Sequence, residues 1–80
     1  MRLNMETLLD ILSEMHPDVD FEKEDHLVER GILGSFDIVM LVTRIEEEFD
    51  VVIPARLITP ETFFSAGSLM KTIDKLSEED

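Results

Sequence analysis

The fold of this 80-residue chain is decided by one stretch, Gly34-Ser35-Phe36-Asp37-Ile38-Val39-Met40-Leu41-Val42-Thr43-Arg44-Ile45-Glu46-Glu47-Glu48-Phe49. Its apolar side chains recur at the spacing of a buried helix face, at Ile38, Val39, Leu41, Val42, Ile45 and Phe49. We expect Ser35 to be the N-cap of this helix and residues 46–48 to cover its solvent side. Because β-branched residues lower helix propensity, packing against other elements must stabilise the helix.

Upstream, residues 5–15 form a second predicted helix. Asn4 is the expected N-cap, and Pro17 ends the helix because the residue before a proline disfavours the α region. The apolar stripe of this helix comprises Met5, Leu8, Leu9, Leu12 and Met15.

Residues 17–34 form an unusually long connection, and its length suggests a function or an anchoring role. Asp20 or Asp25 is expected to cap a short helical turn that Gly31 ends. The apolar residues expected to anchor this connection on the helices are Val19, Phe21, Leu27, Val28, Ile32 and Leu33.

After residue 50, a strand is not expected at residues 51–53, because this segment is short, isolated and followed by Pro54. Thr59 as N-cap and Pro60 as the first helical residue predict a short helix with Phe63 and Phe64 on its apolar face. A last helix is expected from Ser65, with a stripe of Leu69, Met70, Ile73 and Leu76. The prediction is an all-α fold: a small antiparallel four-helix bundle with three main helices, one short helix and a long first loop, in a single domain over residues 1–80.

Composition limits the classes of function. Seven Lys and Arg against 19 Asp and Glu give a formal net charge of -12 and a pI near 4.3. This charge argues against binding to nucleic acid or to an anionic membrane, and it favours basic surfaces on partner proteins. No signal peptide or apolar run long enough for a membrane span is recognisable, so we expect a cytoplasmic protein, monomeric at this charge.

Catalytic and metal-binding patterns are poor. The chain has no cysteine, and its two histidines, His16 and His26, lack metal-binding spacing. His16 is expected to be a solvated histidine at a helix end. The alternating acids of residues 18–24 lack the glycine and the terminal glutamate of a calcium-binding EF-hand loop. We therefore expect neither a metal site nor enzymatic activity.

Ser35 is the residue with the clearest chemical potential. As an N-cap it would have a purely structural role. It could also carry a phosphate ester, because the free N–H groups and the dipole of a helix N-terminus stabilise phosphate. A serine-hydrolase role is not expected, because residues 34–37 do not form a G-x-S-x-G elbow and no histidine is close in sequence.

Residues 27–42 resemble the attachment region of the acyl carrier protein family, in which Asp-Ser-Leu is followed by an amphipathic helix. Residues 45–50, Ile-Glu-Glu-Glu-Phe-Asp, and Ile53-Pro54 match the family's continuation. Residues 58–63 and the helix after Ser65 are similar to its third and fourth helices. The resemblance covers nearly the whole chain.

The resemblance implies a non-catalytic carrier whose Ser35 receives 4'-phosphopantetheine from coenzyme A through a separate phosphopantetheinyl transferase. The thiol of that group would hold acyl or aminoacyl groups as thioesters, which would explain a carrier without cysteine. Asp37 matches a common acid after the serine. Gly34 departs from the usual Asp, and it either loosens the approach to Ser35 or allows a positive φ.

The helix after Ser35 is the expected contact surface for loading ligases and acyl-transfer enzymes with basic patches. Phe36 and Met40 are candidate apolar anchors or, alternatively, partly buried core residues. The other candidate partner-binding residues are Asp37, Arg44, Glu47 and Glu48, with Arg44 as a candidate for partner selection.

The cargo and the pathway stay open at this level. Residues 29–33 resemble carriers that an adenylating ligase loads, such as the D-alanyl carriers of cell-wall modification, whereas fatty acid, polyketide and peptide carriers are alternatives. Two further readings share the same fold. One is an unmodified acidic helical adaptor that binds a basic partner protein through Phe36 and Met40, and the other is a purely structural bundle.

Overall fold

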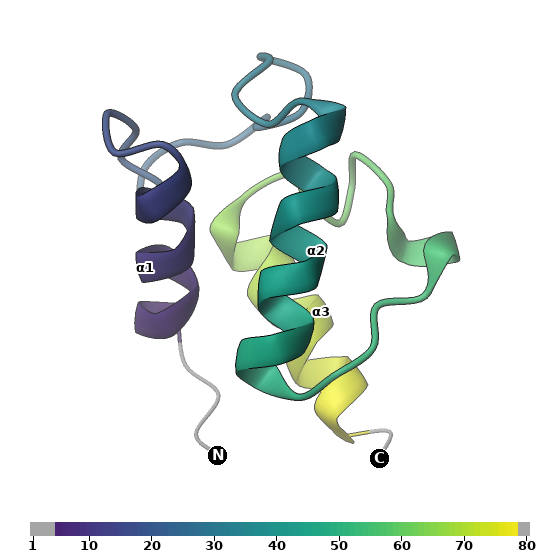
Figure 1. Ribbon diagram of the computed structural model, residues 1–80. Helices are drawn as coiled ribbons and strands as arrows, with labels where there is room; N and C mark the ends of the chain where they lie inside the picture. The colour runs from purple at the N-terminus through teal and green to yellow at the C-terminus, as the bar shows by residue number, and fades with distance from the viewer. Residues whose placement is uncertain (1–4, 79–80) are drawn as a thin grey trace.

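The computed structural model describes residues 5–78, which form three α-helices and one turn of 3₁₀ helix. Helix α1 spans Met5–Met15, α2 spans Ser35–Phe49, η1 spans Ala55–Leu57 and α3 spans Ala66–Glu78. No strand occurs within these described residues. In Figure 1, α1 runs upward and α2 downward, with the long connection between them crossing the top of the molecule, and α3 lies behind. The prediction of an all-helical fold is confirmed.

Helix α1 packs against both other helices. Each helix buries one apolar face, at Leu8, Ile11 and Leu12 of α1, Leu41, Ile45 and Phe49 of α2, and Ala66, Leu69, Met70 and Ile73 of α3. The bounds of α1 agree with the prediction, although Ile11 is a buried residue that the predicted stripe omitted. The predicted N-cap Asn4 lies outside the described residues.

The long first connection is anchored on the core, as predicted. Phe21, Leu27 and Leu33 are buried, and the Leu27 amide donates to the carbonyl oxygen of Phe64 at 3.0 Å. Asp20 accepts from the Glu22 amide at 3.2 Å, within an earlier turn than the one predicted for it. Asp25 Oδ1 pairs with the His26 ring, so the prediction that Asp20 or Asp25 caps the turn that Gly31 ends is wrong. A second turn ends at Gly31, whose φ of +77° is the left-handed conformation that glycine adopts most readily. These anchors determine where the chain enters α2.

The predicted short helix from Pro60 is wrong. Residues 59–64 form hydrogen-bonded turns, in which the Thr62 amide donates to Thr59 Oγ1 at 3.2 Å and the Phe63 amide donates to the Thr59 carbonyl oxygen. Thr59 therefore caps a turn as expected, but this turn does not continue into a helix, and α3 begins at Ala66. The short 3₁₀ turn lies earlier, at η1. The expected absence of a strand at residues 51–53 agrees with the structure.

Two predictions about α2 are also wrong. Gly34 is the N-cap and Ser35 is the first helical residue, so the helix begins one residue earlier than the serine-cap prediction required. Val39 was assigned to the core face, but its side chain is 63% exposed. Only part of the α2 surface is covered by neighbouring elements, and the 3.6-residue period does not indicate where that coverage ends.

Candidate functional site

Ser35 lies at the exposed N-terminal end of α2. The first hydrogen bond of the helix runs from the Ile38 amide to the Gly34 carbonyl oxygen at 3.0 Å, so the amides of residues 35–37 lie outside the helical ladder. The Ser35 hydroxyl makes no hydrogen bond within residues 5–78. A solvent-facing hydroxyl therefore lies beside free amides at the positive end of a helix dipole.

Asp37 fixes the geometry of this helix start. Its Oδ2 accepts a hydrogen bond from the Gly34 amide at 3.1 Å and a second one from His16 Nε2, also at 3.1 Å. The side chains of Asp37 and His16 are only 29% and 30% exposed. The prediction of His16 as a freely solvated residue is therefore wrong. Asp37, which we predicted to bind partners, makes these two contacts within the protein.

An apolar surface follows Ser35 along α2. Phe36 is 76% exposed and Met40 is 47% exposed, so both lie off the core as the anchor interpretation requires. Val39, three residues after Phe36, extends the same exposed face. We call Phe36, Val39 and Met40 the apolar row. Sequence analysis missed Val39 because its spacing also fits the buried face.

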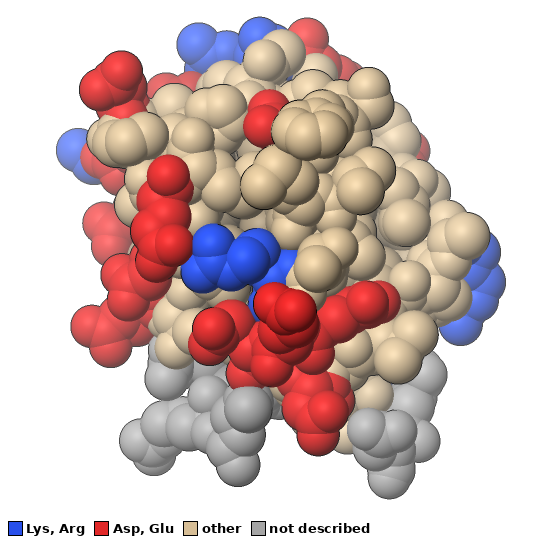
Figure 2. All heavy atoms as spheres, viewed as in Figure 1, with Lys and Arg blue, Asp and Glu red and all other residues tan. Residues whose placement is uncertain are grey.

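The C-terminal half of α2 has a different character. Glu47 and Glu48 are exposed, whereas Glu46 is half-buried and its Oε2 accepts from the Ile53 amide at 3.0 Å. The expectation that Glu46 only covers the solvent side is therefore wrong. Arg44 donates to Glu14 Oε1 of α1 at 3.1 Å, so its charge is partly offset within the protein. Figure 2 shows mainly uncharged side chains over the upper part of α2 and acidic ones gathered over its lower end and beside α1.

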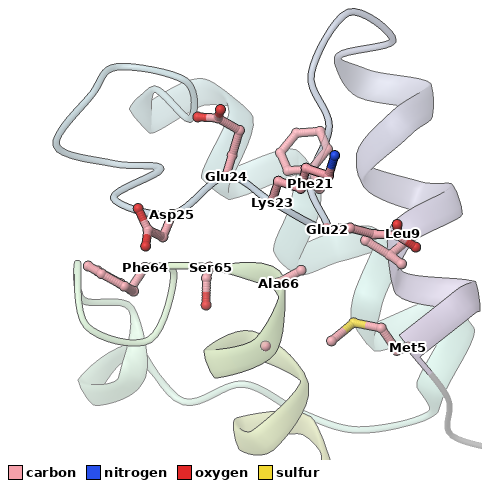
Figure 3. Close-up of a pocket in the computed structure, with 11 residues that line it drawn as sticks. Met5, Leu9, Phe21, Glu22, Lys23, Glu24, Asp25, Phe64, Ser65 and Ala66 are labelled. Atoms are coloured by element: carbon pink, nitrogen blue, oxygen red, sulfur yellow. The ribbon is translucent and has the colours of Figure 1, made fainter.

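A pocket of about 390 Å³ lies away from this site, between α1, the first connection and the start of α3. Figure 3 shows Met5 and Leu9 on one side and Phe64, Ser65 and Ala66 on another. Four consecutive charged residues, Glu22 to Asp25, complete its wall. None of the residues that begin α2 lines this pocket, so it is distinct from the exposed serine.

Two kinds of site do not occur among the described residues. Within residues 5–78, no three acidic or histidine side chains come together in a way that could hold a metal ion. In the same range, no helix is both long enough and apolar enough to cross a membrane.

Comparison with known proteins identifies the family. No protein-family model matches the chain. The chain is 35% identical over 63 residues to Aminoacyl carrier protein 2 of Bradyrhizobium diazoefficiens, a match that covers 79% of this chain and 70% of the relative. The chain belongs to the acyl carrier protein family. This membership agrees with the all-helical fold and with the resemblance of residues 27–42, and it indicates a carrier role.

One residue of this acyl carrier protein departs from the family's usual attachment motif. Gly34 has φ -85° and ψ 175°, an extended conformation that any residue adopts. A Cβ atom at this position would lie 3.8 Å from Asp37 Oδ2, an ordinary contact distance. Neither backbone conformation nor lack of space requires glycine here, so the suggestion that Gly34 allows a positive φ is wrong.

Proposed function

We propose that this protein is an acyl carrier whose Ser35 is modified with 4'-phosphopantetheine by a separate transferase. The observation that carries the proposal is the Ser35 hydroxyl, which is exposed on the first turn of α2 and makes no hydrogen bond within residues 5–78. Family membership supports the same assignment. The protein itself needs no catalytic group for this role, because the transferase supplies the chemistry.

The start of α2 suits a phosphodiester. In the transfer, the Ser35 oxygen forms a bond to phosphorus and loses its proton, and the bond from phosphorus to the adenosine bisphosphate part of coenzyme A breaks. The amides of residues 35–37, which lie outside the helical ladder, would face the new anion and favour it with the helix dipole. When attached, the group supplies a terminal thiol that holds its cargo as a thioester.

We propose an aminoacyl cargo. The relative from Bradyrhizobium diazoefficiens is named as an aminoacyl carrier protein. The centre of the bundle is filled by fully buried side chains such as Leu8, Leu41 and Phe63. Fatty acyl, D-alanyl, polyketide and peptide cargoes are the competing possibilities within the same role.

The partners we propose are the phosphopantetheinyl transferase, an aminoacyl-loading ligase and acyl-transfer enzymes. The apolar row lies within two turns of Ser35 and offers a centre for their contact surface. Glu47 and Glu48 are exposed further along α2 and complement a basic patch on each partner. Arg44 keeps its proposed role in partner selection, with Glu14 as its resting partner. A cytoplasmic location fits these partners.

Intact-protein mass spectrometry tests the modification. The protein is incubated with coenzyme A, Mg²⁺ and a broad-specificity phosphopantetheinyl transferase. We expect one phosphopantetheine to be added to the wild type and to Ser13→Ala, and none to Ser35→Ala. Ser13 is the matched control, since it is an exposed helical serine outside the site. No addition under several transferases would contradict the proposal and favour the unmodified adaptor.

The cargo is tested on the modified protein. It is incubated with ATP, a mixture of amino acids and an amino-acid-adenylating ligase, and its mass is measured before and after hydroxylamine treatment. We expect one amino acid to be added and then removed, because hydroxylamine cleaves thioesters. Charging by a fatty acyl ligase in the absence of aminoacylation would instead indicate a lipid carrier.

A further inference from the structure

We propose that His16 is a positioning residue for the attachment site, because it orients the carboxylate that fixes the first turn of α2 around Ser35. This inference rests on the proposed modification of Ser35 and adds a residue from a different part of the chain. His16 follows α1 directly and lies 21 residues before Asp37 in sequence.

The link between His16 and the start of α2 passes through a single oxygen atom. Asp37 Oδ2 accepts from His16 Nε2 and from the Gly34 amide, both at 3.1 Å. An ionised carboxylate can only accept, so His16 Nε2 carries the proton in this contact. The Gly34 amide belongs to the residue immediately before Ser35. The orientation of Asp37 therefore determines how firmly the chain is held just before the attachment residue.

His16 is itself held firmly. Its amide donates to the Leu12 carbonyl oxygen at 2.9 Å, and its own carbonyl oxygen accepts from the Val19 amide at 3.2 Å. Its ring lies 6.5 Å, between centroids, from the ring of buried Phe21. Two backbone hydrogen bonds hold the main chain of His16 and Phe21 lies beside its ring, so the imidazole restricts the rotation of Asp37 more than water would. In this way the end of α1 is coupled to the attachment turn.

His26 provides a matched comparison within the same protein. Its Nδ1 also contacts a carboxylate, Asp25 Oδ1 at 2.8 Å, but both side chains are more than half exposed. Asp25 is the residue immediately before His26, and it makes no hydrogen bond to α2 among the described residues. Replacement of His26 therefore controls for the loss of a histidine–carboxylate pair as such.

The test compares His16→Ala, His16→Gln and His26→Gln in two measurements. The first is hydrogen exchange of the Gly34 amide in the unmodified protein, and the second is the kinetics of phosphopantetheine transfer. For His16→Ala we expect exchange of the Gly34 amide about fivefold faster, and a KM of the transferase for the carrier raised about fivefold, as for the loss of one ordinary hydrogen bond. The kcat should not change, because the transferase orders the turn on binding.

The Gln variant distinguishes positioning from packing. The glutamine Nε2 can still donate to Asp37, so His16→Gln should recover most of both effects, and His26→Gln should match the wild type. Unchanged Gly34 exchange in His16→Ala, or equal defects in His16→Ala and His16→Gln, would overturn the proposal. If the wild type is not modified at all, the proposed function fails, and the exchange measurement alone still decides the role of His16.

Discussion

Helix α3 begins at a serine whose hydroxyl caps the helix, whereas α2 begins beside a serine whose hydroxyl makes no hydrogen bond within residues 5–78. In α3, the Ser68 amide donates to Ser65 Oγ at 3.1 Å, and the Ser65 amide donates back to Ser68 Oγ at 3.0 Å. In α2, only the second half of this exchange is present, from the Gly34 amide to Asp37 Oδ2. The two helix starts share a geometry but differ in the use of serine.

This comparison shows how a serine at a helix start can be left without a capping role. A serine that caps a helix uses its oxygen as an acceptor and has a structural role. With Gly34 as N-cap, Ser35 is the first helical residue, and its exposed side chain does not cap the helix. Asp37 supplies a different stabilising contact, because its carboxylate accepts from the Gly34 amide. The fold therefore separates the residue that stabilises α2 from the residue proposed to be modified.

The largest expected effect concerns modification of the two serines. Ser35→Ala should abolish phosphopantetheine transfer, whereas Ser65→Ala should be modified as fully as the wild type. Intact-mass measurement after transfer checks both variants. Modification that persists in Ser35→Ala and disappears in Ser65→Ala would reverse the assignment of the two helix starts.

The second helical residue of α2 and of α3 offers the next comparison. Phe36 is 76% exposed in α2, and the equivalent Gly67 in α3 has no side chain. Phe36→Ala should lower the kcat/KM of a partner enzyme about tenfold, as for an interface anchor. Gly67→Ala should leave it unchanged, since a Cβ there lies 3.7 Å from Ser65 Oγ. Steady-state kinetics with the transferase checks this, and a parallel loss of folding stability in Phe36→Ala would show a core role instead.

The free energy of unfolding should respond in the opposite order to modification, with the larger loss in Ser65→Ala than in Ser35→Ala. Ser65→Ala should lower the free energy of unfolding by about 1 kcal/mol, because it removes a capping oxygen. Ser35→Ala should change it by less than about 0.5 kcal/mol, because its hydroxyl caps nothing. Urea unfolding of the two variants measures both values. Equal losses would mean that Ser35 caps α2 in solution.

The smallest expected effect is at Gly34. Gly34→Asp restores the family's usual residue and should change the free energy of unfolding by only a few tenths of a kcal/mol. A new capping acceptor favours the folded state, and repulsion from Asp37 opposes it. Gly34→Ala is the control, because it adds the Cβ without the charge. Urea unfolding compares the three proteins. A loss above about 1 kcal/mol in both variants would show that the turn requires glycine, and such a loss in Gly34→Asp alone would show that repulsion from Asp37 dominates.

Sequence reasoning succeeded where the controlling interactions are local. Helix α1 begins and ends where the stripe from Met5 and the break at Pro17 predict, because both signals act within a few residues. Ser65 begins the last helix as expected. Phe36 and Met40 were predicted to be either apolar anchors or partly buried core residues, and the structure shows both side chains exposed.

Sequence reasoning failed where segments that are distant in the sequence come into contact. The contact between His16 and Asp37 joins residues 21 positions apart, and no periodicity or motif indicates such a pair. The bond from the Ile53 amide to Glu46 depends on the path of the chain after α2 ends. A carboxylate that would face solvent in an isolated helix can accept a hydrogen bond from a backbone amide once another segment packs across it.

The sequence by itself therefore determined the all-helical architecture, the acidic character and the serine that begins the second helix. Periodicity, proline positions and charge are properties of short segments, and they operate before the chain is folded. Only the tertiary structure decided that Gly34 caps α2, that Asp37 is used internally and that Val39 joins the exposed apolar row. Those outcomes depend on how α1 and the long first connection pack against α2, because packing determines which groups lose contact with water.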